Sequence, residues 1–115
     1  MTQKLPDPLR HPTGKPMEST RLTGLLLPFK DGAPLFVHMP GSDGHLYLPV
    51  FTSTSALSAA DAFMHFEHDS TKVIADGTAF VTSVPRKVGD AEVHIILDPR
   101  LVDGVRTRWL EVKFD

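Results

Sequence analysis

Turn signals divide residues 22–51 into three short apolar runs, and the position of these turns restricts the fold more than any other feature. The runs "GLLLPFK", "PLFVHMP" and "HLYLPVF" are separated by Asp-Gly at 31–32 and by "GSDG" at 41–44. Such turns join antiparallel strands because their residues tolerate positive φ angles. We therefore expect three sequential antiparallel strands, a β-meander. Pro49 has no amide proton, so it should lie at a sheet edge or a strand end.

Helical periodicity replaces this pattern in the next segment. Residues 55–67, "SALSAADAFMHFE", predict a helix because apolar side chains recur three and four residues apart. A second, shorter helix is predicted within "ADGTAFVTSVP". There Phe80 and Val84 lie four residues apart, and Pro85 prevents the helix from continuing.

The C-terminal part returns to strand periodicity. The segments "AEVHIILDP", residues 91–99, and "TRWLEVKF", residues 107–114, alternate their apolar side chains, and Asp-Gly at 103–104 suits the turn between them. The resulting element order is β-β-β-α-α-β-β. It predicts an α+β fold in which two helices pack on a mainly antiparallel sheet of about five strands.

The length of 115 residues suits one domain, which we place at residues 22–115. Residues 1–21 contain four prolines and few large apolar side chains, so they predict a flexible or extended arm; a partner-binding tail is the alternative. This arm lacks the apolar core of a secretory signal, and no apolar run approaches the roughly 18 residues of a membrane span. We therefore expect a soluble, cytoplasmic protein with no membrane partner.

The charge balance argues against nucleic acid as a partner. A formal net charge of −2 gives no general attraction to a polyanion. The basic side chains that could still bind one are Arg86, Lys87, Arg100, Arg106 and Arg108. Arg106 and Arg108 precede Trp109, and together these residues could instead form an interaction surface for an acidic protein. For Trp109 itself we favour a position in the core, covered by a helix, because a single aromatic residue is weak evidence for a surface patch.

Four consecutive hydroxyl residues, 52–55, precede the first predicted helix. A nucleophilic hydroxyl needs a base and an oxyanion hole, and the glycine-flanked pattern G-x-S-x-G is absent. A Ser or Thr in front of a helix can instead accept hydrogen bonds from the free amides of the first turn. We therefore interpret the run as a helix cap.

Histidines are the remaining candidates for chemistry. The chain has no Cys, which excludes disulfides, thiolate nucleophiles and cysteine-ligated zinc. His65 and His68 could share one side of a helix, and His38 and His45 flank the "GSDG" turn. Their spacing matches no recognised ligand set, so we predict no metal site and no cofactor. Imidazoles near a helix C-terminus also complement the helix dipole.

Three short motifs carry a family resemblance. They are "LPVFTSTSAL", "VIADGTAFVTSVP" and "VHIILDP", and together they resemble the N-terminal domain of the bacterial SseB family, the enhanced serine sensitivity proteins. The residues that match the family pattern are Pro49, Val50, Phe51, Thr52 and Ser53, then Asp98 and Pro99. The resemblance covers residues 22–112 and implies a small α+β module without a catalytic set to transfer. Longer members carry a second domain, for which this chain has no room.

These observations favour a non-enzymatic bacterial protein-interaction module. One version is an immunity or regulatory protein that masks its partner, and an adaptor is another. The alternative is a small-molecule or metal-binding domain that uses His38, His45, His65 or His68. An exposed edge strand could also pair two copies into a homodimer.

Overall fold

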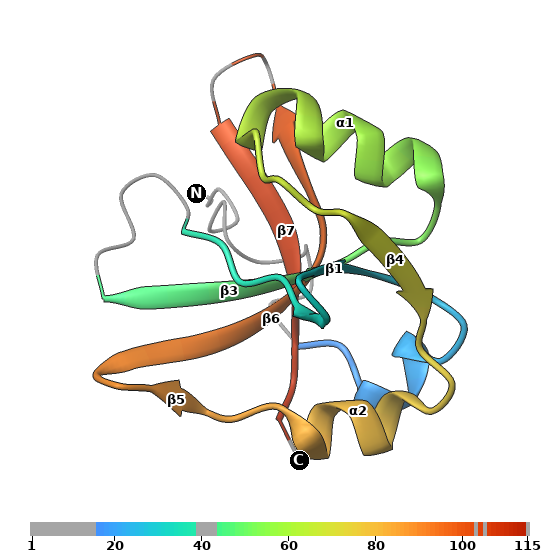
Figure 1. Ribbon diagram of the computed structural model, residues 1–115, viewed down its shortest axis with the longest axis vertical. Coiled ribbons are helices and arrows are strands. Elements are labelled where there is room, and N and C mark those ends of the chain that lie inside the picture. The colour runs from blue at the N-terminus through green and yellow to red at the C-terminus, as the bar shows by residue number, and fades with distance from the viewer. Residues whose placement is uncertain (1–15, 39–43, 103, 105, 115) are drawn as a thin grey trace, which may run out of the picture.

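The computed structural model describes residues 16–38, 44–102, 104 and 106–114, which form two sheets and two helices (Figure 1). In chain order the elements are a 3-10 helix η1 (Ser19–Leu22), β1 (Leu26–Lys30), β2 (Ala33–Pro34), β3 (His45–Val50), α1 (Thr54–Met64), β4 (Ser70–Val73), α2 (Gly77–Ser83), β5 (Lys87–Val88), β6 (Ala91–Val102) and β7 (Arg106–Val112). The predicted α+β class, with two helices and mostly antiparallel strands, is confirmed.

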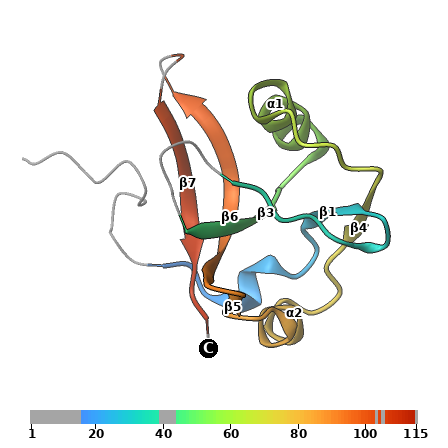
Figure 2. The same ribbon diagram turned by 60° about the vertical axis from the view of Figure 1, so that its left-hand side comes forward.

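The strands form two separate sheets. The first has the order β2-β1-β4 and is antiparallel throughout. In the second, β6 pairs with β3 in parallel and with β5 and β7 in antiparallel fashion. Figure 2 shows β6 and β7 on one side of the molecule and β1 and β4 on the other, with α1 and α2 at opposite ends. The long central strand β6 therefore organises the second sheet.

The predicted meander is correct for its first hairpin, but among the described residues its third strand keeps only one antiparallel bridge to the second run, Val37 to Tyr47. Asp31 and Gly32 take positive φ angles of 53° and 81° and join β1 to β2. The third strand, β3, instead pairs in parallel with residues 92–97 of β6. Its residues 47–50 are buried on both faces, which is typical of a parallel strand. Pro49 does lie near the end of an edge strand, as predicted.

Both predicted helices form, and side-chain oxygens cap them. The Ser53 hydroxyl accepts a hydrogen bond from the Ala56 amide at 3.1 Å, so the helix-cap interpretation of the hydroxyl run is confirmed. The helix α1 ends at Met64 because His65 takes a left-handed conformation with φ 55°. Asp76 caps α2 in the same way, accepting from the Ala79 amide at 3.2 Å.

The main core lies on one face of the second sheet. Its buried side chains come from η1, both sheets and α2, and include Leu22, Leu27, Leu48, Val50, Ile74, Val81, Val84, Val93, Ile95, Leu97 and Val112. A second cluster under α1 contains Phe51, Leu57, Ala60 and Phe66. The opposite face of the second sheet buries Tyr47, Ile96 and Trp109, with Val37 and Met64 packed against them.

The packed domain begins earlier than the sequence boundary at residue 22. Met17 exchanges two main-chain hydrogen bonds of 2.8 Å with Glu111 and Lys113 at the end of β7. Ser19 is 3% exposed, so η1 belongs to the packed structure. The backbone pairing of Met17 and the burial of Ser19 thus hold a segment whose composition does not reveal it, and residues 1–15 of the predicted arm lie outside the described residues. Among the helices of the described part, none is long and apolar enough to cross a membrane.

Candidate functional site

Strand register gathers polar and aromatic side chains on the face of the second sheet opposite the main core. His45 lies opposite Glu92, and Tyr47 lies opposite His94, in the β3–β6 pairing. Alternate residues of a strand point to the same face, so all four side chains share one surface. Trp109 and Glu111 join them from β7, because Glu111 is the partner of Ile96.

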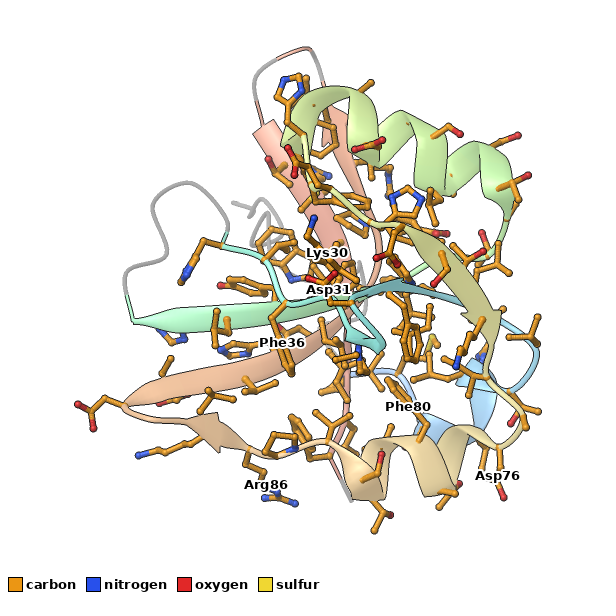
Figure 3. All side chains as sticks on the ribbon, viewed as in Figure 1. Lys30, Asp31, Phe36, Asp76, Phe80 and Arg86 are labelled. Carbon is orange, nitrogen blue, oxygen red and sulfur yellow. The ribbon has the colours of Figure 1, made fainter. Side chains whose placement is uncertain are left out.

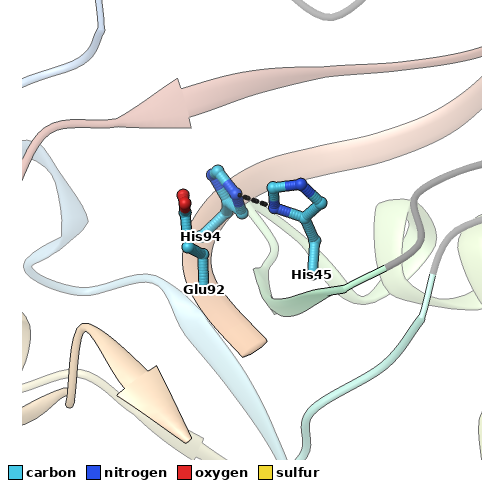
Figure 4. Close-up of side chains that lie close together, drawn as sticks. All are labelled: His45, Glu92 and His94. Atoms are coloured by element: carbon cyan, nitrogen blue, oxygen red, sulfur yellow. Dashed lines mark hydrogen bonds between the residues drawn. The ribbon is translucent and has the colours of Figure 1, made fainter. Parts of the chain in front are cut away.

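Two imidazoles meet at the centre of this surface. His45 Nδ1 lies 2.9 Å from His94 Nε2, as Figure 4 shows. The candidate ligand atoms of His45, Glu92 and His94 all lie within 4.8 Å of one another. We call these three residues the imidazole cluster. The two histidines are half-buried and Glu92 is exposed, so solvent reaches the cluster.

Neighbouring side chains fix the orientation of the His94 ring. Tyr47 stacks on it with ring centroids 5.1 Å apart. On its far side, His94 Nδ1 faces Glu111 Oε2 at 3.5 Å. Glu111 in turn accepts from the Trp109 indole N–H at 3.4 Å. These contacts from Trp109 through Glu111 therefore hold the His94 ring at Nδ1, on the side away from His45.

A second candidate site lies between the first sheet and α2. Leu27 and Phe29 of β1 and Phe80 of α2 line two adjoining cavities of about 370 and 400 Å³. Figure 3 shows Phe80 rising from α2 toward β1. The first cavity is bordered by Lys72, Val73 and Ala79, and the second reaches Phe36 and Pro85. We call these two cavities the β1–α2 groove.

The strand beside this groove is the outer edge of the first sheet. All four residues of β4 are exposed, and Val73 is 62% exposed. Lys72 stands over the Phe29 ring, with Nζ 4.7 Å from the ring centroid, and so marks the rim of the groove with a positive charge. The sequence does not predict β4, because "STKV" has neither apolar alternation nor a turn signal of its own.

The histidines that the sequence proposes as ligands do not come together. His65 is exposed at the end of α1, whereas His68 packs against the Phe66 ring at 5.4 Å. His38 Nδ1 lies 3.2 Å from the backbone oxygen of His45 but does not belong to the imidazole cluster. Of the four candidates, only His45 contributes to the cluster, and its partners Glu92 and His94 come from β6.

Trp109 does not present an exposed ring to a partner. It is 4% exposed and packs against Tyr47, with centroids 5.3 Å apart, so the alternative of a covered tryptophan is the correct one. Arg108 is half-buried, with Nε buried and without a hydrogen-bond partner among the described residues. The side chain of Arg106 lies outside the described ones. The interaction surface predicted around Trp109 therefore lacks its aromatic centre.

The other basic candidates divide between two ends of β6. Lys87 lies opposite Glu92, and Arg86 stands over the Phe114 ring at 5.2 Å. Arg100 lies opposite Arg108 at the far end of the strand. Eight residues of strand separate Glu92 from Arg100, or about 26 Å. These basic candidates thus form two groups, one of which lies opposite Glu92 in the strand register.

The motifs that carry the family resemblance meet in space. The Thr52 backbone amide donates to Asp98 Oδ1 at 3.0 Å, and its hydroxyl donates to Asp98 Oδ2 at 2.8 Å. Pro49 and Pro99 are both fully buried, as are Val50 and Phe51. The motif therefore joins the end of β3 to a bulge in β6 and directs the chain into α1.

Comparison with known proteins agrees with this arrangement. The family profile described as the SseB protein N-terminal domain matches residues 23–105. No curated protein and no solved structure matches the chain. Since the matched segment spans most of the chain and contains both halves of the motif, the protein belongs to the SseB N-terminal domain family.

Proposed function

We propose that the protein is a non-enzymatic interaction module that binds an extended segment of a partner protein along β4. The observation that carries the proposal is the exposed outer edge of β4 beside the apolar β1–α2 groove. A strand at a sheet edge has backbone groups ready to pair with another chain. Strand addition supplies main-chain hydrogen bonds, and neighbouring pockets supply selectivity for side chains.

The chemistry of the groove indicates which segment it would accept. Leu27, Phe29 and Phe80 give an apolar lining, which suits one large aliphatic or aromatic side chain. Lys72 lies on the same face of β4 as the groove, because it is the partner of Leu27. An acidic residue next to Lys72 on the added strand would form a favourable cross-strand pair. The preferred ligand is therefore an extended apolar segment with an adjacent Asp or Glu.

Such binding would suit a protein that masks its partner, as an immunity or regulatory protein does. An exposed apolar segment of the partner would be covered by β4 and the groove without any chemical step. A second copy of this chain is the competing occupant, because β4 could also pair with another β4 across a two-fold axis.

Selection from a library of displayed random peptides, with the full chain as bait, tests the proposal. We expect selected peptides to share an apolar residue next to an acidic one and to protect the amides of β4 from hydrogen exchange. Ala79→Phe should fill the first cavity and weaken binding at least about tenfold. Ala59→Phe, at an exposed position of α1, is the matched control and should leave affinity unchanged.

Three results would contradict the proposal. Peptides that bind Ala79→Phe as tightly as the parent chain would place the site elsewhere. Failure to select any peptide above background would show that the protein does not bind extended peptides along β4. A concentration-dependent dimer by light scattering, with β4 amides protected and no peptide binding, would assign the edge to a second copy.

A further inference from the structure

We propose that the imidazole cluster is a binding site for a divalent transition-metal ion of the zinc type, held by His45, Glu92 and His94. This inference does not depend on the β1–α2 groove, because the imidazole cluster lies on the face of the second sheet that points away from the main core. It rests on the convergence of three ligand atoms, on the support behind His94 and on the rigidity of the strands that carry them.

The two facing histidine nitrogens need little movement to fit a metal centre. Zinc binds imidazole nitrogen at about 2.0–2.1 Å, so two nitrogens of a tetrahedral site lie about 3.3 Å apart. His45 Nδ1 and His94 Nε2 are 2.9 Å apart. Opening this pair by about 0.4 Å would admit the ion, which rotation of two side chains can supply. A Glu92 carboxylate oxygen lies within 4.8 Å of a ring nitrogen of each histidine, so rotation of this exposed side chain would bring it into the coordination sphere as the third ligand.

The contacts of His94 prepare its ring for a metal. A metal-binding histidine commonly donates its second ring N–H to a carboxylate, which fixes the tautomer and leaves the other nitrogen free to bind. Here Nδ1 faces Glu111 Oε2 at 3.5 Å, and Trp109 holds the other oxygen of the same carboxylate. A proton on Nδ1 leaves the Nε2 lone pair directed at His45. This is the tautomer that a metal ion requires.

A simple hydrogen bond between the two rings is the competing explanation. With Nδ1 of His94 protonated, its Nε2 is the acceptor and His45 Nδ1 must donate. Metal binding would shift the His45 proton to its Nε2, so that both facing nitrogens offer lone pairs. The hydrogen bond explains the close approach of the rings. It involves neither the Glu92 carboxylate nor the Glu111 carboxylate that faces Nδ1 of His94.

The ligand types indicate which ions bind. Two imidazole nitrogens and one carboxylate oxygen suit zinc, copper, nickel or cobalt, whereas calcium and magnesium prefer oxygen ligands throughout. Three protein ligands leave a fourth position of a tetrahedral ion for water or for a side chain of a partner. His94 is 25% exposed and Glu92 is more open, so both the ion and that fourth ligand can approach from solvent.

The strands make the geometry reproducible. His45, Glu92 and His94 lie on two directly paired strands, and β6 has neighbours on both sides. Sites built on strands hold their side chains more precisely than sites on loops. Tyr47, which is 4% exposed, further restricts the His94 ring by stacking on it.

Metal titration of the full chain, without a histidine tag and after treatment with a chelator, tests the proposal. We expect one Zn²⁺ per chain by calorimetry, and one Co²⁺ per chain with the intense visible absorption of a tetrahedral centre. Imidazole ¹⁵N spectra should show His45 changing tautomer on Zn²⁺ addition. His45→Gln and His94→Gln should each weaken binding more than tenfold, whereas the controls His65→Gln and His68→Gln should not.

Two further variants separate ligand loss from misfolding. Glu92→Gln changes an exposed side chain and keeps its volume, so the fold should survive while Zn²⁺ affinity falls. Glu111→Gln removes the carboxylate behind His94 and should weaken binding about 10–100-fold. Absence of stoichiometric binding would overturn the proposal. So would binding that withstands His45→Gln and Glu92→Gln but is lost in His65→Gln or His68→Gln, because the metal would then lie at the end of α1.

Discussion

Thr52 and Asp98 join the two halves of the family motif through a pair of hydrogen bonds, although 46 positions separate them in the chain. Asp98 takes a left-handed conformation, with φ 49°, at the point where the β6–β7 register shifts. Its carboxylate accepts from both the amide and the hydroxyl of Thr52. The bulge in β6 therefore has a specific partner at the end of β3, and the chain leaves that point directly for α1.

Replacing Asp98 tests the combined contribution of its left-handed conformation and its two hydrogen bonds. Asp98→Ala loses both bonds and puts an unfavourable residue at positive φ, so we expect destabilisation of about 2 kcal/mol. Asp98→Asn tolerates the left-handed conformation but loses the charge, and it should cost less. Urea unfolding of both variants measures the difference. Equal losses in the two variants would show that backbone conformation is not a factor.

Gly77 should not tolerate even one additional carbon. A Cβ placed on it would meet the Ser19 carbonyl oxygen and come within 3.0 Å of the Thr23 amide nitrogen. Its own amide donates to the Thr23 hydroxyl at 2.8 Å, which holds α2 against the chain after η1. Gly77→Ala should therefore destabilise the fold by about 1–3 kcal/mol, despite the better helix propensity of Ala.

Thr78→Ala is the control for this prediction. Thr78 is exposed, and its hydroxyl lies 3.4 Å from the Ser19 hydroxyl. Thermal unfolding should show a small change for Thr78→Ala and a large one for Gly77→Ala. If the two melting temperatures are the same, the close approach of η1 to α2 is not what requires glycine.

Local signals predict the elements well, and long-range pairing explains what they miss. Ser53, within the hydroxyl run, caps α1 as expected, and the Asp31-Gly32 turn forms the predicted hairpin. A parallel partner for β3 is not predictable, because its apolar residues suit either pairing and β6 lies more than 40 positions away. The short exposed strands β4 and β5 likewise depend on neighbours rather than on their own composition.

The same reason explains why the sequence does not identify the imidazole cluster. His65 and His68 attract attention because they are close in the chain, and they do not meet in the structure. His45 and His94 are 49 positions apart and meet because of the β3–β6 register. Alternation along "AEVHIILDP" does place Glu92 and His94 on one strand face, but only the register adds His45.

Ser53 should account for most of the stabilisation from the hydroxyl run. Its side chain accepts from the Ala56 amide, and removing such a cap typically costs about 1 kcal/mol. Ser53→Ala should therefore lower the free energy of unfolding by about that amount. Ser55 is the second residue of α1 and is exposed, so Ser55→Ala should change the free energy of unfolding little. Chemical denaturation distinguishes the two, and a larger effect at Ser55 would contradict the assigned cap.

Acid should weaken the contact between the β1–β2 turn and the start of β4. The Asp31 amide donates to Asp69 Oδ2 at 2.9 Å, and this hydrogen bond lowers the Asp69 pKa below its ordinary value of 3.8; Ser70 and Lys30 act in the same direction. A lowered pKa in the folded state means that the ionised carboxylate contributes stability above pH 3.8. That contribution is lost as the pH falls through the folded-state value.

Asp69→Asn should therefore reduce the dependence of stability on pH in this acidic range. We expect the urea midpoint of the parent chain to fall more steeply below pH 3.8 than that of the variant. The effect should be modest, because Asp69 is exposed. Asp90→Asn, an exposed acid beside β6, is the control and should keep the steep profile. Parallel curves for the parent chain and Asp69→Asn would contradict the prediction.

Trp109 provides a direct optical test of the covered face of the second sheet. It is the single tryptophan of the chain. Its side chain is 4% exposed and packs against the Tyr47 ring. Its emission should therefore be shifted to shorter wavelength relative to unfolded protein and be poorly quenched by iodide. Trp109→Phe keeps an aromatic ring but removes the indole N–H that holds Glu111, so Zn²⁺ affinity should fall several-fold while the fold is retained. Strong iodide quenching would instead show an exposed ring and restore the interaction surface predicted around Trp109.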